Sequence, residues 1–305
     1  MPILAEVVRS GVVESMHTGS VLAVDGSGAT VLVRGEVDQP IFPRSSNKPL
    51  QVVALLAAGW QPGDDEQIAL ATASHSGEPE HLAVVRRMLA GAGLTEDALR
   101  CPPGLPLSEP AAQALLASGD TASSLTMNCS GKHAAMLATC VARGWPTQTY
   151  LEVDHPVQQA IARTLAEMAG EPVAHLAVDG CGAPQHALTL RGLARAFTAL
   201  VRDHPQVTRA MRAHPHLVGG TGRDVTALME RVPGLVAKDG AEGVYAAALA
   251  NGSAVVLKIA DGAGRARTPV LVKALQSLEI FGLEDLATVA VLGGGRVVGE
   301  VRATV

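Results

Sequence analysis

The sequence predicts an α+β fold, in which one antiparallel sheet is built from both ends of the chain and a helical region is inserted between them. Valine-rich segments of strand length occupy the first 35 residues and return after residue 243. Segments with the helical spacing of apolar residues fill most of the middle. No linker, repeat or low-complexity tract separates these parts. We therefore expect a single domain over residues 1–305, with a sheet lobe at about 1–44 and 174–305 and a helical lobe at about 45–173.

The expected elements follow from local signals. Strands rich in valine are expected near the start at 3–9, 11–17, 20–25 and 29–35, and Asp25-Gly26-Ser27-Gly28 is typical of a hairpin turn. Proline and capping residues mark several helix starts, as in Asp154-His155-Pro156. The expected helices are 48–58, 64–73, 79–90, 109–118, 130–143, 155–169, 191–202, 206–213, 224–231 and 268–278. Further strands are expected at 174–179, 243–249, 253–260 and 296–304.

Composition excludes some classes of function. Hydrophobic residues make up 48% of the 305 residues and the net charge is −5, which is typical of an ordered globular protein. Nucleic acid is not an expected partner, because no basic run occurs and aromatic residues, which would stack on bases, are only 2%. The sequence has no apolar run of membrane-spanning length, and its first residues do not have the pattern of a secretory signal. We expect a cytoplasmic protein that does not associate with membranes.

The most informative stretch is Arg44-Ser45-Ser46-Asn47-Lys48-Pro49, which precedes an apolar helical run. Residues three apart lie on one face of a helix, so Ser45 and Lys48 can meet, and a neutral lysine can take the proton of an attacking serine. The alternative is structural: Ser46 or Asn47 caps the helix and Pro49 stands in its first turn.

Lysine is scarce: only five of the 24 basic residues are lysines, at positions 48, 132, 238, 258 and 273. Arginine stays protonated in proteins, whereas a buried lysine can lose its proton. Lys258 stands in an apolar strand, where it needs a partner or a lowered pKa, unless the strand lies at an edge and the amine faces solvent.

Two further polar segments are candidates for a site. The Ser74-His75-Ser76 loop can supply a hydroxyl, although Ser76 is equally consistent with a helix cap before Pro79. Gly219-Gly220-Thr221-Gly222-Arg223 lacks the ending of a phosphate-binding P-loop. We interpret it as a turn into a helix, with Arg223 able to bind a carboxylate.

The cysteines form the remaining candidate. Cys129, Lys132 and His133 share one helix face at the start of the 130–143 segment, and Cys181 follows Asp179 in a glycine-rich loop. Cys129 and Cys181 are therefore either thiolate ligands of a zinc site or buried reduced thiols.

Taken in order, these segments resemble the bacterial L-asparaginase II family, the group typified by Rhizobium-type thermolabile asparaginases. The resemblance covers about residues 3–300 and rests on six segments: Arg44–Lys48, Ala73–Glu78, Asn128–His133, Val178–Gly182, Gly219–Arg223 and the strand of Lys258.

The resemblance implies a fold related to serine β-lactamases and glutaminases, and hydrolysis of L-asparagine to L-aspartate and ammonia. It makes Ser45 the nucleophile and Lys48 its base, and pairs Lys258 with either Ser74 or Ser76. Substrate would be bound by Arg44, Asp179 and Arg223, with His133 in the same site. It further implies a zinc ion held by Cys129, Lys132 and Cys181, and a homodimer.

Two rival functions remain at this stage. A glutaminase or a β-lactamase-like serine amidohydrolase would use the same Ser-x-x-Lys pattern. A protein that binds zinc or an amino acid without catalysis would use the cysteines but leave the serine and lysine residues without a role.

Overall fold

The computed structural model describes residues 1–305. Its main sheet has eight strands in the order β11-β12-β1-β2-β10-β9-β8, with β3 paired to β2 off this path, and every pairing is antiparallel. The strands are β1 (Ile3–Arg9), β2 (Val12–Val24), β3 (Thr30–Arg34), β8 (Val236–Gly240), β9 (Val244–Ala248), β10 (Ala254–Ile259), β11 (Val289–Gly293) and β12 (Arg296–Ala303). Both ends of the chain contribute, so the predicted α+β architecture is confirmed.

Strand β2 joins the two halves of the sheet. Its first half pairs with β1 and its second half with β10 and β3. The sequence predicted two strands here, 11–17 and 20–25, and the structure has one. In the structure Gly19 allows the close approach of a neighbouring strand, since a Cβ at this position would overlap the carbonyl oxygen of Lys258.

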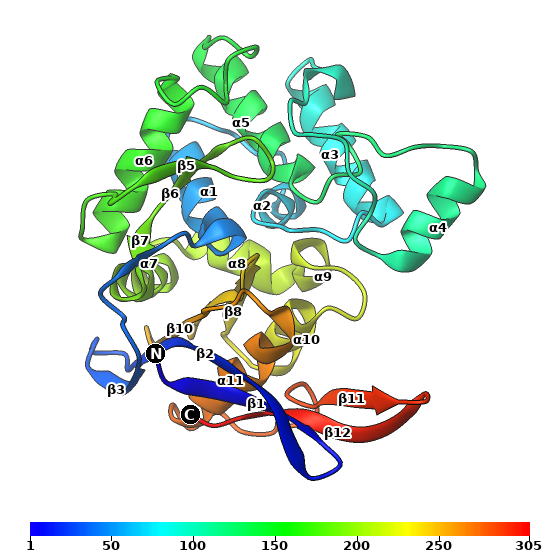
Figure 1. The fold of residues 1–305 in the computed structure, drawn as a ribbon. Helices are drawn as coiled ribbons and strands as arrows, with labels where there is room; N and C mark the ends of the chain where they lie inside the picture. The colour runs from blue at the N-terminus through cyan, green and yellow to red at the C-terminus, as the bar shows by residue number, and fades with distance from the viewer.

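The inserted helices lie on the side of the molecule away from strands β11 and β12 (Figure 1). They begin within one residue of the predicted positions, because each carries its own start signal. Asp64, for example, accepts a hydrogen bond from the Gln67 N–H at the start of its helix. These helices are α1 (Lys48–Ala57), α2 (Asp65–Ala71), α3 (Pro79–Gly91), α4 (Glu109–Ala117), α5 (Ser130–Arg143) and α6 (Pro156–Ala169).

A second group of helices connects this region to the sheet. Helices α7 (Leu190–Asp203) and α11 (Arg267–Gln276) both pack against β10, and α8 (Pro205–Ala213) packs against α2. Helices α9 (Pro215–Val218) and α10 (Asp224–Arg231) follow, and α10 contacts β8. Two small ribbons complete the fold: β4 (Pro40–Ile41) pairs with β7 (Leu188–Thr189), and β5 (Leu176–Val178) with β6 (Pro184–His186).

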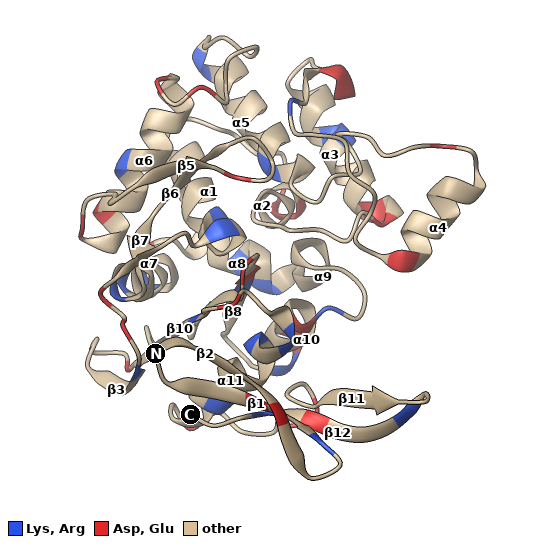
Figure 2. Cartoon of the chain, in the orientation of Figure 1, with Lys and Arg blue, Asp and Glu red and all other residues tan.

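The two chain ends meet at the sheet, where the Thr304 N–H donates to the Leu4 carbonyl at 2.9 Å (Figure 1). The hydrophobic core is one cluster of 76 buried residues that includes both strands and inserted helices. In the view of Figure 2, positions of both signs are scattered over the inserted helices and the sheet. None of the helices combines the length and the apolar character needed to cross a membrane.

Candidate active site

The Ser-x-x-Lys pattern lies at the mouth of α1, as predicted. Residues Arg44–Asn47 form a 3-10 turn, η1, and Lys48 is the first residue of the helix. Ser46 donates its hydroxyl to the Pro43 carbonyl at 2.7 Å, and Asn47 makes no side-chain capping bond. Asn47 stands at the N-cap position and Pro49 in the first turn, as the structural alternative expects, but neither Ser46 nor Asn47 makes a side-chain capping bond to the helix. Ser45 is partly exposed and its hydroxyl makes no hydrogen bond within the protein, so it can face a bound molecule.

Lys48 is buried and points away from solvent. Its Nζ donates to the Ala73 carbonyl at 2.5 Å, to Ser74 Oγ at 3.1 Å and to Cys129 Sγ at 3.0 Å. The amine thus connects the α1 mouth to the loop between α2 and α3 and to the start of α5.

A second lysine reaches the same serine. Lys238, in the buried strand β8, donates from Nζ to Ser74 Oγ at 3.0 Å and to Asp239 Oδ1 at 2.6 Å. Ser74 Oγ therefore accepts hydrogen bonds from two buried amines. Ser76 instead donates to the Gly219 carbonyl at 3.0 Å. Of the two serines left open by the sequence, Ser74 is the one that contacts the lysines.

The prediction that Lys258 pairs with a serine of this loop is wrong. Its Nζ donates to the carbonyls of Glu242 and Ile259, both at 2.6 Å. The reason is topological: β10 lies inside the sheet between β2 and β9, whereas β8 is the last strand in the order and packs most closely against η1. Lys238 had a signal in the sequence, since it is one of five lysines and directly follows the apolar residues 235–237.

The backbone of β8 comes close to the turn that carries Ser45. A Cβ at Gly240 would lie 2.6 Å from the Pro43 carbonyl oxygen and 3.3 Å from the Ser46 nitrogen. A glycine is thus required where the strand meets η1. This approach places Ser45 and Lys238 on neighbouring segments.

A charged network supports Lys238. Burial lowers the pKa of Lys238 to about 8, although the Asp239 carboxylate opposes this shift. Burial alone would raise the pKa of Asp239, but Lys238, Arg223 and Arg267 together hold it below its ordinary value of 3.8. Asp239 therefore stays ionised.

Arg223 belongs to this network. One terminal nitrogen donates to Asp239 Oδ2 at 2.8 Å and the other to the Ser74 carbonyl at 3.3 Å. Both terminal nitrogens are thus engaged within the protein, an arrangement that favours positioning of Ser74 over the carboxylate binding expected from the sequence.

Arg44 and Asp179 form an ion pair beside Ser45. The Arg44 Nε donates to Asp179 Oδ1 at 2.7 Å, and the Gly180 N–H donates to the same oxygen at 2.8 Å. The Arg44 backbone has φ of 54°, in the left-handed region that costs a residue with a Cβ roughly 1–2 kcal/mol. Strain of this kind concentrates at functional sites.

The cysteine cluster lies behind Lys48. Cys129 and Cys181 are buried, and Lys132 Nζ donates to Cys181 Sγ at 3.1 Å. The interaction between the two neighbouring thiols raises the pKa of Cys129 and lowers that of Cys181, and the Lys132 amine adds to the second shift. The Cys129 thiol donates to Asn128 Oδ1 at 2.9 Å. His133 is completely buried beside Cys181, with Nδ1 2.7 Å from the Tyr150 hydroxyl.

This cluster has the chemistry of a zinc site. The buried His133 Nε2 has no hydrogen-bond partner, which leaves a nitrogen available near two sulfurs. Two thiolates with nitrogen donors are a set that zinc commonly takes. Burial lowers the pKa of Lys132, but Cys181 and Cys129 outweigh it and raise this pKa above 10.5, so a metal has to displace a proton. The types of donor present are those that zinc takes, although Cys129, Cys181 and His133 are not among the groups whose ligand atoms all lie within 4.8 Å of one another.

The solved structures that resemble this chain share little sequence identity with it. Mglu shares 13% identity over 86% of this chain and 63% of its own, with a TM-score of 0.45. A β-lactamase from Mycobacterium bovis shares 12% identity over 88% and 95% of the two chains, with a TM-score of 0.45. Simvastatin synthase from Aspergillus terreus shares 12% over 86% and 88%, with a TM-score of 0.42. The chain thus spans less than two thirds of Mglu, and none of these likenesses supports a conclusion on activity.

No curated protein matches the sequence. The family model described as L-asparaginase II, in contrast, matches residues 5–303, nearly the whole chain. All the site segments described above lie within that match, from Arg44 to Lys238. The chain belongs to the L-asparaginase II family, and it is an amidohydrolase.

Proposed function

We propose that the protein hydrolyses L-asparagine to L-aspartate and ammonia through an acyl-enzyme on Ser45. The observation that carries the proposal is the buried Lys48–Ser74–Lys238 chain of hydrogen bonds beside the turn that presents Ser45. A serine alone is a weak nucleophile, and neighbouring amines that can exchange its proton activate it.

The two serines differ in exposure, which supports giving them different roles. Ser45 is partly exposed and attacks the side-chain amide carbon of asparagine. Lys48, whose Nζ contacts Ser74 and not Ser45 in the structure, has to turn toward Ser45 in its neutral form to receive the proton. The C–N bond then breaks and the nitrogen takes the proton back from Lys48, leaving as ammonia. Water attacks the ester, releases aspartate and restores the Ser45 hydroxyl. Ser74 is buried, so it relays protons between Lys48 and Lys238.

The substrate is recognised by the Arg44–Asp179 pair. Asparagine carries an α-carboxylate and an α-ammonium group, which are complementary to a guanidinium and a carboxylate. Side-chain exposure is 25% for Arg44 and 9% for Asp179, so the pair is accessible from one side. Arg223 holds the Ser74 backbone and does not contact the substrate in this mechanism.

We also propose that Cys129, Lys132 and Cys181 hold a zinc ion, with His133 beside them. When bound, zinc would supply positive charge behind the active centre. The residues themselves contribute burial and a fixed position for Lys48, whose Nζ donates to Cys129. A homodimer and a cytoplasmic location stay predictions.

The test is ammonia release from asparagine, with glutamine and nitrocefin as competing substrates and with the Ser45→Ala variant as control. The wild type should release ammonia from asparagine faster than from glutamine and should leave nitrocefin intact, and Ser45→Ala should lose the activity. Full activity in Ser45→Ala would remove the nucleophile assignment. Faster turnover of glutamine or nitrocefin would favour the rival amidohydrolases, and the absence of turnover on all three would favour a binding protein.

A further inference from the structure

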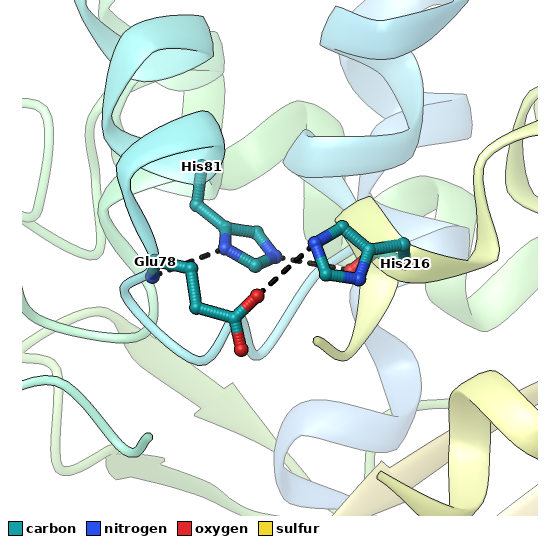
Figure 3. A group of neighbouring side chains, drawn as sticks. All are labelled: Glu78, His81 and His216. Carbon is teal, nitrogen blue, oxygen red and sulfur yellow. Dashed lines mark hydrogen bonds and ion pairs between the residues drawn. The ribbon is translucent and has the colours of Figure 1, made fainter. Parts of the chain in front are cut away.

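A second cluster of metal-binding side chains lies at the start of α3, apart from the cysteines. His216, on the short helix α9, faces the first residues of α3 (Figure 3). Its Nε2 is 3.1 Å from Glu78 Oε2 and 3.2 Å from Glu80 Oε2. His81 lies beside them, and ligand atoms of Glu78, His81 and His216 are all within 4.8 Å of one another.

These distances are only slightly shorter than those between two ligands of one cation. Zinc binds imidazole nitrogen and carboxylate oxygen at about 2.0–2.2 Å, so two ligands of one tetrahedral ion lie about 3.3–3.6 Å apart. A single imidazole N–H can be shared between two carboxylate oxygens as a three-centre hydrogen bond, whereas a cation would bind both oxygens directly. The Glu80 side chain is 75% exposed, and its carboxylate is therefore able to turn toward an ion between Glu78 and His216.

The surroundings of the cluster hold these groups in place. The Glu78 carboxylate accepts the N–H and the hydroxyl of Thr221, both at 3.1 Å. His81 joins the two segments, because its Nδ1 accepts the Glu78 N–H at 3.2 Å and its Nε2 lies 3.0 Å from the His216 carbonyl. Both His81 nitrogens are thus engaged, and its ring stacks on that of His216 with centroids 5.2 Å apart. Hydrogen bonds that orient ligands in this way are typical of built metal sites.

We propose that His216 Nε2 and the carboxylates of Glu78 and Glu80 bind a divalent transition-metal ion such as zinc, which takes both imidazole and carboxylate ligands. His81 is a positioning residue, which fixes the backbone of both Glu78 and His216. The remaining coordination positions face solvent and are filled by water.

The consequence of this site is structural. The ion ties α3 to the segment that runs from His216 through Thr221 to Arg223, and Arg223 contacts the Ser74 carbonyl. A bound metal therefore restrains the segment that positions Ser74, without contacting the reacting groups. Because it binds only the folded state, it should also raise the melting temperature.

The experiment is a titration of the metal-free full-length protein with Co²⁺, followed by visible absorption and by equilibrium dialysis. Cobalt held by imidazole and carboxylates gives ligand-field bands alone, whereas cobalt at the cysteines adds thiolate-to-metal charge transfer. We expect a component without charge transfer, and its affinity should fall at least about tenfold in Glu80→Gln and in His216→Asn. Added zinc should displace the bound cobalt from this site.

Glu109→Gln is the matched control, because Glu109 is also an exposed first-turn glutamate but has no histidine neighbour. It should bind as the wild type does. Equal affinity in wild type, Glu80→Gln and His216→Asn would overturn the proposal, as would cobalt bound only with charge transfer. In either case the contacts of His216 are ion pairs alone. Because Glu80 is exposed, the Glu80→Gln variant should fold. The test therefore stays decisive even if His216→Asn does not fold.

Discussion

Ser74 Oγ accepts hydrogen bonds from Lys48 and Lys238, so the two amines share one proton path. Lys238→Met keeps the length of the side chain but removes the amine, and it should lower kcat for asparagine by about 10²–10⁴-fold, the usual contribution of a general acid–base group. Lys258→Met is the matched control, since Lys258 contacts only two backbone carbonyls. Steady-state kinetics should find the control near wild type. A larger loss in Lys258→Met than in Lys238→Met would restore the assignment made from the sequence.

The protonation state of Lys238 should determine how kcat/KM depends on pH. Its pKa is about 8 because burial disfavours the charged amine, and only the neutral amine accepts a proton. The value of kcat/KM should therefore rise with pH until about 8 and then level. When kcat/KM is measured from pH 6 to 9.5, the residual activity of Lys238→Met should not show this rise. An activity that is flat or falls between pH 6 and 8 would contradict a role for neutral Lys238.

The two serines of the Ser-His-Ser loop provide a further comparison. Ser74→Ala breaks the link between the lysines and should reduce kcat by at least about 100-fold. Ser76→Ala removes one hydrogen bond to the Gly219 carbonyl, which the Ser76 N–H still satisfies. It should cost only about 0.5–1.5 kcal/mol of stability. Kinetics and urea unfolding of both variants separate the roles, and equal activities would mean that the loop serves packing alone.

At the scale of elements, the contact between β8 and η1 holds the two halves of the site together. Gly240→Ala would place a methyl group 2.6 Å from the Pro43 carbonyl oxygen, so either the strand or the turn has to move. We expect a loss of about 1–3 kcal/mol in the free energy of unfolding, the usual cost of overpacking, together with reduced kcat. Gly264→Ala, which meets no atom within 4 Å, is the control. Unchanged activity in Gly240→Ala would show that the fit between these elements does not position Ser45.

Strand β8 is also an example of an element that local sequence signals do not predict. Helices such as α3 and α5 were found because proline, capping residues and apolar spacing are local signals. Strand β8 was missed, since all five of its residues are buried although two are charged. Its burial depends on Arg223 and Arg267 neutralising Asp239, and these lie far away in the sequence. Strands β4 and β7 have only two residues each, too few to form a pattern.

In the active site, too, local signals were recognisable in the sequence and long-range contacts were not. Lys48, Cys129 and Cys181 stand in segments that were recognisable one at a time. The structure joins Lys48 to Cys129 and Lys132 to Cys181. The partner of Ser74 depends on which strand borders the helical region, and that is decided by the strand order of the whole sheet. Local sequence could narrow the choice to five lysines but could not select Lys238.

At the scale of the whole molecule, buried titratable groups set the response to acid. Burial lowers the pKa of His186 to about 4, and burial likewise lowers the pKa of His75 well below 6.5. Between these values and 6.5 the unfolded chain binds protons that the folded protein does not, so stability is lost as pH falls through this range. Asp239 also causes a loss of stability as the pH falls, but at lower pH, because its pKa lies below 3.8 in the folded protein.

Urea unfolding should therefore give a smaller free energy of unfolding at pH 5 than at pH 7, by about 1.4 kcal/mol for each pKa unit that is crossed by one such group. His186→Asn should reduce this difference, because the group that must be protonated on unfolding is gone. His175→Asn, which changes an exposed histidine, should leave it as it is. A free energy at pH 5 equal to or above that at pH 7 would mean that the buried histidines are charged in the folded protein. In that case the interior around Ser74 would have to accommodate more positive charge than its single buried carboxylate, Asp239, can balance.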